Sequence, residues 1–196
     1  MEKCIYCLGD SNTYGYDPRS PFGDRYEAPW PELLGKALFC RIFCDGLNGR
    51  STADVILGYD LLKDRLLRQQ PDLLILLLGS NDILMDGLTD PAAISSRMEE
   101  LLKKIRLEFA CLPILLLSPP PIRIPGPWMN TIISLSRFYE NLAQKYHTDF
   151  LNLLNLSLPL SYDGVHLTEE GHRQLAEILS LLLKKGTPFH NAEISP

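Results

Sequence analysis

Residues 73–82 read LLILLLGSND: six apolar side chains in a row, followed at once by Gly79, Ser80, Asn81 and Asp82. A strand with one face in water alternates apolar and polar residues, whereas an unbroken apolar run of this length is typical of a strand buried on both faces. Gly, Ser, Asn and Asp favour turns. The stretch therefore predicts a central strand of a parallel sheet, covered by helices on both sides and ending in a polar turn.

The rest of the chain repeats this arrangement of strand, turn and helix. Buried parallel strands are predicted at residues 3–8, 41–45, 73–78, 113–118 and 149–153. Helical periodicity indicates helices at residues 30–39, 53–68, 92–109, 129–147 and 168–185. The alternation runs without a compositional break or an internal repeat. It predicts one α/β domain over residues 1–196, a three-layer α/β/α fold with a flavodoxin-like, doubly wound, five-stranded parallel sheet.

The composition argues against several classes of partner. The formal net charge is -5, from 24 acidic and 19 basic side chains, and no basic run is present, so no nucleic-acid partner is expected. The longest apolar runs, LLILLLG and LPILLLSP, are too short to span a bilayer, and the first apolar run is too short for a secretion signal. We expect a cytoplasmic protein without a membrane partner. A homo-oligomer is compatible with the sequence, which does not determine the oligomeric state.

The cysteines carry no clear redox signal. Their number, five, is odd, which argues against a complete disulfide framework. Cys4 and Cys7 form a CxxC pattern, but both fall in the first predicted strand, where residues three apart point to opposite faces. We therefore expect reduced, structural thiols.

Polar residues and glycines follow the predicted strands. In a doubly wound sheet, ligands bind beyond the carboxyl ends of the strands, so these loops are where a site is expected. The loops read GDSN after the first strand, GLNGRST after the second, GSND after the third, SPPPIRIPGPW after the fourth and SYDGVHL after the fifth. Each is an ordinary loop by itself, but all five lie at the same edge of the predicted sheet, and this indicates a binding or catalytic site there.

The residues in these loops suit nucleophilic attack on an acyl group. Ser11 needs a base within hydrogen-bond reach, and His166 can supply it. Asp163, three residues earlier, can orient the imidazole through its other nitrogen. The oxyanion formed by the attack requires donors, and the candidates are the Ser11 N–H, the Gly49 N–H and the Asn81 side-chain amide.

This set of motifs resembles the GDSL, or SGNH, hydrolase family of esterases and lipases, over nearly the whole chain from GDSNTYGY to DGVHLTEEGHRQLAE. The four signature positions of the family, Ser, Gly, Asn and His, fall on Ser11, Gly49, Asn81 and His166, and Asp163 completes a DxxH pair. The resemblance implies a serine ester hydrolase that cleaves short-chain carboxylic esters through an acyl-enzyme, with a small-molecule ester as its substrate and with no metal or cofactor.

The motif versions GDSNTYGYDP and GLNGRST look most like the arylesterase and acyltransferase branch of the family. Acyl transfer is therefore an alternative outcome wherever an alcohol competes with water for the acyl-enzyme. The first block of the family often has Leu after the serine, whereas this chain has Asn12. The departure bears on substrate choice, and neither the acyl group nor the alcohol follows from the sequence.

Three other interpretations of the motifs are open. Ser51 lies in GRSTA, close to the GxSxG pattern of another hydrolase fold, although a helix N-cap explains it equally well. A flavodoxin-like phosphate- or nucleotide-binding module without hydrolase activity would use DSNTYG as its phosphate loop, but would leave DGVH without a purpose. A metal site is disfavoured, because the histidines show no HxH or HExxH spacing; they are His147, His166, His172 and His190.

The walls of an acyl pocket are expected in two proline- and aromatic-rich loops. Phe22, Tyr26 and Trp30 are candidates for one wall, although Trp30 packing under the first helix is an equal alternative. Trp128 and residues 119–121, all proline, are candidates for the opposite wall. His172 is expected at the surface.

Overall fold

The computed structural model describes residues 2–20 and 22–185. Its centre is a five-stranded sheet in which every neighbouring pair is parallel, in the order β2-β1-β3-β4-β5. This confirms the predicted doubly wound parallel sheet. The strands lie within two residues of their predicted bounds; they are β1 (Cys4–Gly9), β2 (Arg41–Gly46), β3 (Leu73–Leu77), β4 (Ile114–Leu117) and β5 (Asp149–Leu151).

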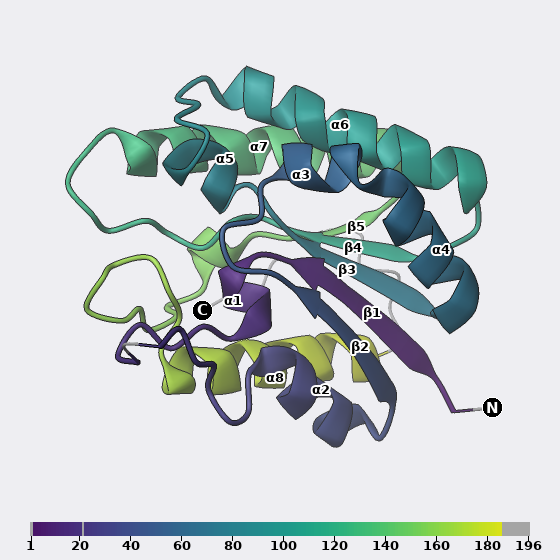
Figure 1. The fold of residues 1–196 in the computed structure, drawn as a ribbon. Coiled ribbons are helices and arrows are strands. Elements are labelled where there is room, and N and C mark those ends of the chain that lie inside the picture. The colour runs from purple at the N-terminus through teal and green to yellow at the C-terminus, as the bar shows by residue number, and fades with distance from the viewer. Residues whose placement is uncertain (1, 21, 186–196) are drawn as a thin grey trace.

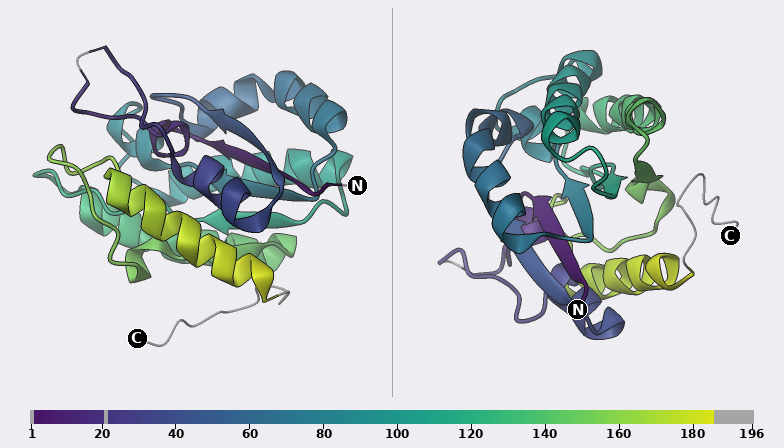
Figure 2. Two further views of the ribbon diagram at one scale, coloured as in Figure 1. Left: turned by 90° about the horizontal axis from the view of Figure 1, so that it is seen from below. Right: turned by 90° about the vertical axis from the view of Figure 1, so that its right-hand side faces the viewer.

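Helices cover both faces of the sheet and make three layers (Figure 1). One face carries α2 (Trp30–Leu38) and α8 (Glu169–Lys184), which lie side by side in both views of Figure 2. The other face carries α3 (Thr52–Leu57), α4 (Tyr59–Gln69), α6 (Pro91–Glu108) and α7 (Trp128–Tyr146). The three-layer α/β/α arrangement is therefore as predicted.

Each face of the sheet packs an apolar core of its own. In β1, Tyr6 and Leu8 point into the core beneath α3, α4, α6 and α7, whereas Ile5 and Cys7 point into the core beneath α2 and α8. All residues of β3 are buried, as its unbroken apolar run predicts. This double burial leaves the strand ends as the places where polar side chains reach solvent.

The helices differ from expectation in two respects. The predicted helix at residues 53–68 is two helices, because Gly58 leaves the helical conformation at ψ 22° and separates α3 from α4. Three short helices were not predicted: α1 (Ser11–Tyr14), α5 (Ser80–Leu84) and the 3-10 turn η1 (Leu153–Asn155). They are too short to show periodicity, and their turn-forming residues hide them.

The five cysteines all lie in the described part of the chain and are all free thiols, including Cys4 and Cys7 of the CxxC pattern. None of the helices described at residues 2–20 and 22–185 is long and apolar enough to cross a membrane.

Candidate active site

Strand β1 places Ser11 at the carboxyl edge of the sheet. Ser11 is the first residue of α1, and the Asp10 side chain caps this helix by accepting a hydrogen bond from the Asn12 amide at 2.9 Å. The turn needs a glycine before it, because a Cβ on Gly9 would lie 2.1 Å from Thr13 Oγ1 and 2.7 Å from Leu77 O. The sequence GDS therefore forms a tight strand-to-helix turn that presents the serine.

The loop after η1 brings His166 and Asp163 to this serine. His166 Nε2 lies 2.9 Å from Ser11 Oγ, and His166 Nδ1 lies 2.6 Å from Asp163 Oδ2. The other carboxylate oxygen of Asp163 accepts hydrogen bonds from the Val165 and His166 amides, at 3.0 Å and 3.1 Å. The three predicted side chains thus form one hydrogen-bonded chain, which starts at the hydroxyl and ends at the carboxylate.

Asp163 is held in its ionised form. Partial burial raises the pKa of Asp163, but the hydrogen bonds from the His166 ring and from the Val165 and His166 amides outweigh it, so the pKa lies below its ordinary value. An ionised carboxylate at Nδ1 fixes the tautomer of His166 that leaves Nε2 free to accept the serine proton.

The residues of the three predicted oxyanion donors, Ser11, Gly49 and Asn81, line one cleft. The Ser11 amide is at the first position of α1 and has no intrahelical acceptor. Gly49 has φ +77°, a left-handed conformation that favours glycine, and it lines the same cleft as Ser11. Asn81, in the first turn of α5, donates one Nδ2 hydrogen to Arg50 O at 3.0 Å and keeps a second for another acceptor.

Arg50 is a residue of the site that the sequence analysis missed. Its guanidinium donates to Gly9 O at 3.2 Å and to Asp45 O at 2.6 Å, and it pairs with Asp45 Oδ1 at 2.9 Å. Its carbonyl accepts the hydrogen bond from Asn81 described above. Arg50 therefore ties the loop of Gly49 to β1, to β2 and to α5. The available signal was Asp45, an acidic residue at the end of the predicted strand at residues 41–45, because a carboxylate that the fold buries requires a cationic partner.

The candidate site opens into a cleft of about 470 Å³. Apart from the residues above, its lining consists of Tyr16, Asn48, Leu84, Met85 and Val165. The Tyr16 ring lies 4.8 Å from the His166 ring, centroid to centroid. The apolar part of the lining is thus one aromatic side chain beside His166 together with aliphatic side chains.

None of the residues expected to form acyl-pocket walls lines this cleft, and Trp30 takes the alternative expected for it, packing in the core. Trp30 is fully buried in the core beneath α2, with its indole donating to Asn12 O at 3.1 Å, and Tyr26 is buried against His172. Phe22 is 88% exposed. On the other side, residues 119–121 are buried, and the Trp128 indole donates to Pro125 O. The cleft walls not expected from the sequence are Tyr16, Asn48, Leu84, Met85 and Val165.

His172 is not a surface residue, contrary to expectation. It is 1% exposed, lies in the second turn of α8, and accepts a hydrogen bond from the Trp30 amide at 3.3 Å. Burial lowers the pKa of His172 to about 3, with a smaller contribution from the nearby His166 and Arg25, so this histidine is neutral. The polar sequence EEGHRQ concealed it, because His172 sits on the buried face of an amphipathic helix.

The remaining interpretations find little support in the site geometry. Ser51 is the N-cap of α3 and forms a capping box with Asp54, so its hydroxyl is used in the helix start. Among residues 2–20 and 22–185, no cluster of three or more His, Cys, Asp or Glu side chains is arranged to hold a metal ion. His190 lies outside the described residues.

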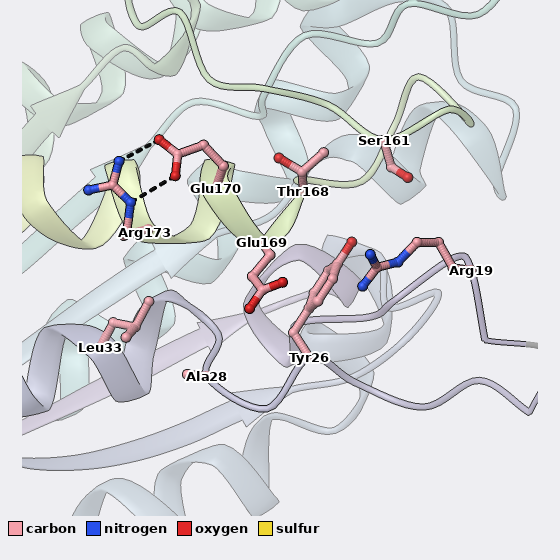
Figure 3. A pocket seen from close by; sticks show the side chains of 9 residues that line it. All are labelled: Arg19, Tyr26, Ala28, Leu33, Ser161, Thr168, Glu169, Glu170 and Arg173. Carbon is pink, nitrogen blue, oxygen red and sulfur yellow. Dashed lines mark hydrogen bonds and ion pairs between the residues drawn. The ribbon is translucent and has the colours of Figure 1, made fainter.

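A second hollow, of about 480 Å³, lies beside the start of α8 (Figure 3). Three of its four charged lining residues are paired within the protein: Arg173 binds Glu170, and Arg19 binds Asp17 while lying over the Tyr26 ring; the fourth is Glu169. Ser161 and Thr168, on its rim, flank the loop that carries Asp163 and His166. The cleft at Ser11, where a nucleophile and a base meet, is therefore the stronger candidate.

Comparison with known proteins agrees with this geometry. The chain is 23% identical to an acetylxylan esterase of Xylanibacter ruminicola, in a match that covers 92% of this chain and 43% of that protein. The chain thus spans less than half the length of this curated relative.

Solved structures resemble the fold over almost its full extent. The aryl esterase of M. smegmatis matches with a TM-score of 0.78 and 26% identity, covering 93% of this chain and 99% of that one. A carbohydrate acetylesterase family member from Sinorhizobium meliloti matches with a TM-score of 0.76 and 26% identity, covering 93% and 98%. The model of the GDSL-like lipase/acylhydrolase family matches residues 7–174, and the chain belongs to that family.

Proposed function

We propose that the protein is a serine carboxylic ester hydrolase in which Ser11 is the nucleophile, His166 the general base and Asp163 the residue that orients the imidazole. The observation that carries the proposal is the chain of two short contacts, 2.9 Å from Ser11 Oγ to His166 Nε2 and 2.6 Å from His166 Nδ1 to Asp163 Oδ2. Nucleophile, base and orienting carboxylate at such distances can activate a serine that is otherwise unreactive.

The reaction would proceed in two halves. As Ser11 Oγ attacks the ester carbonyl, His166 Nε2 takes its proton, and the Ser11 amide, the Gly49 amide and the Asn81 side chain donate to the oxyanion. The tetrahedral intermediate then collapses, and the departing alcohol takes the proton from His166. In the second half, His166 removes a proton from water as it attacks the acyl-enzyme, and the collapse of the second intermediate returns that proton to Ser11 and releases the acid.

We propose short acyl groups as the substrates. The related proteins include an acetylxylan esterase and a carbohydrate acetylesterase family member, and the cleft of about 470 Å³ is of the size that holds a small ligand. The side chains of His166 and Asp163 are 18% and 25% exposed, so water can reach the base. Hydrolysis is the main expected course, with acyl transfer to an added alcohol competing at high alcohol concentration.

The flavodoxin-like binding module is not favoured, because the family match and the arrangement of Asp163 and His166 are unexplained by it. We also propose that residues 1–196 form one domain. In support, β5 adds the last strand to the sheet begun by β1, and α8 packs against α2.

The test is covalent labelling together with turnover. The purified protein should hydrolyse 4-nitrophenyl acetate, and a serine-directed phosphonate should add its mass to the peptide that contains Ser11. Ser11→Ala should abolish both, while Ser51→Ala, the matched control, should retain both. Label on the peptide of Ser51, or turnover that survives Ser11→Ala, would overturn the assignment.

A further inference from the structure

Asn12, the residue after Ser11, is buried at 1% exposure, and all of its polar groups are hydrogen-bonded. Its amide donates to Asp10 Oδ1 at 2.9 Å, and its carbonyl accepts from Trp30 Nε1 at 3.1 Å. These two bonds fix the backbone of α1 to the strand end on one side and to the core beneath α2 on the other. Neither bond uses the side-chain amide of Asn12.

The side chain of Asn12 reaches the loop that carries the candidate base. Its Oδ1 accepts from the Leu167 amide at 2.9 Å, and its Nδ2 donates to Val165 O at 3.4 Å. Val165 and Leu167 are the two neighbours of His166. The amide group therefore holds the main chain on both sides of the histidine, across 153 and 155 residues of sequence.

The other hydrogen bonds of this loop do not reach the nucleophile. Asp163 Oδ1 binds the Val165 and His166 amides, Ser161 N binds His166 O, and Arg123 N binds Gly164 O. In the part of the chain that the structure describes, the hydrogen bonds between α1 and residues 163–168 are the two from the Asn12 side chain and the Ser11–His166 contact.

We propose that Asn12 is a positioning residue that sets the distance and angle between Ser11 Oγ and His166 Nε2. The inference rests on the proposed function of these two residues. Because Ser11 and Asn12 are consecutive in one helical turn, any shift of the His166 loop relative to Asn12 is a shift relative to the nucleophile. A leucine, which is of similar size, can fill the same space but cannot bind the Leu167 amide or the Val165 carbonyl.

The experiment compares Asn12→Leu with Asn152→Leu. Asn152 is a matched control, since its side chain also joins two segments by accepting from the Leu154 amide and from Ser118 Oγ, but it does not touch Ser11 or His166. Both variants should lower the Tm. Asn12→Leu alone should lower kcat on 4-nitrophenyl acetate, by about 10- to 100-fold, the effect expected when reacting groups move by up to about 1 Å. Its KM should stay within about twofold, as expected when positioning rather than binding is lost.

Asn12→Asp keeps the size of the side chain and the acceptor for the Leu167 amide, and serves if the leucine variant does not fold. A protonated carboxyl can donate to Val165 O, whereas an ionised one cannot. Asn12→Asp, once ionised, should therefore lower kcat on 4-nitrophenyl acetate while its KM stays within about twofold.

The outcomes separate this inference from the proposed function. A wild-type protein that neither turns over esters nor takes the phosphonate label would end both. An active wild type in which Asn12→Leu matches the kcat of Asn152→Leu, or in which a folded Asn12→Asp keeps the wild-type kcat up to about pH 9, would overturn the positioning role alone.

Discussion

Asp10, the residue before Ser11, carries an ionisable side chain that the fold removes from solvent. It is 1% exposed, and its Oδ2 is buried without a hydrogen-bond partner among the described residues. Burial raises the pKa of Asp10 from 3.8 to about 7, although the hydrogen bond from the Asn12 amide partly opposes the rise. We therefore expect Asp10, which caps α1, to change charge near neutral pH.

This shift predicts a pH dependence of stability. Between pH 3.8 and about 7 the folded state holds a proton on Asp10 that the unfolded state has lost. The stabilisation linked to that proton is fully present below pH 3.8 and is lost as the pH rises through about 7. Asp10→Asn keeps the cap but cannot ionise, so its Tm should fall less between pH 5 and pH 8 than that of the wild type.

Thermal unfolding at both pH values measures this difference, with Asp90→Asn as the control. Asp90 also caps a helix, α6, by accepting from the Ala92 amide, but it is exposed. A pH effect of at least about 2 °C, which corresponds to about 1 kcal/mol or less in a chain of this size, should distinguish Asp10→Asn from the wild type. Equal pH slopes in wild type and Asp10→Asn would show that Asp10 does not titrate in this range.

At the scale of elements, the long strands and helices follow from their sequences, whereas the short ones do not. In a chain that alternates strands and helices, an unbroken apolar run predicts a strand that is covered on both faces, and β3 is such a strand. The segments GDSN and GSND are equally compatible with a turn or with one helical turn, and tertiary packing makes them the starts of α1 and α5.

In the candidate site too, the features set by long strands are predictable and those set by short helices are not. The edge where Ser11, Asn81 and His166 lie is predictable, since parallel strands bring their carboxyl ends together. The cleft walls are not, because Tyr16 follows α1, and Leu84 and Met85 end α5, so their directions depend on those short helices. The segment after α1 does not hold its aromatic side chains at the cleft. Trp30 is buried in the core instead, where its large apolar surface gains more free energy than at a cleft wall.

The loop between β2 and α3 depends on Arg50, and this gives a prediction at the same scale. Asp45 binds two arginines, Arg50 at 2.9 Å and Arg65 at 2.8 Å. Of the two guanidinium groups, that of Arg50 also binds Gly9 O, and it so fixes the main chain whose carbonyl accepts from Asn81 Nδ2. Arg50→Met should therefore loosen the positions of the Gly49 and Asn81 donors, and we expect kcat to fall by about 10-fold or more.

Arg65→Met is the matched control for this change. Both variants remove one cation from the buried Asp45 carboxylate. We expect Arg50→Met to cost about 1–3 kcal/mol of unfolding free energy, and Arg65→Met to cost less because its side chain is 36% exposed. Urea unfolding and 4-nitrophenyl acetate kinetics measure the two effects. Equal kcat values in the two variants would mean that Arg50 contributes stability alone.

At the scale of the whole molecule, the candidate site forms from both ends of the chain. Ser11 lies after the first strand, and His166 is 155 residues later, directly before α8. The two meet because α8 packs against α2 on the same face of the sheet, and Trp30, the first residue of α2, binds both Asn12 and His172. The geometry of the site therefore depends on the packing of the α2 and α8 layer, and not only on the sheet.

The cleft that this assembly leaves beside Ser11 limits the acyl chain. Its volume is about 470 Å³, and its apolar surface comes from Tyr16, Leu84, Met85 and Val165, with the Met85 side chain already 69% exposed. A short acyl group can lie wholly against these side chains, whereas a long one must extend past Met85 into water and forgo about 0.8 kcal/mol for each methylene left unburied. We therefore expect kcat/KM on 4-nitrophenyl esters to be highest from acetate to butyrate and to fall beyond about six carbons, a limit set by typical pocket sizes.

The series from acetate to palmitate, measured below the solubility limit of each ester, tests this prediction of acyl-chain preference. Met85→Ala should shift the profile because it shortens the aliphatic wall. A profile that rises toward palmitate in the wild type would show that the chain binds along a surface outside this cleft, while leaving the roles of Ser11, Asp163 and His166 open to their own tests.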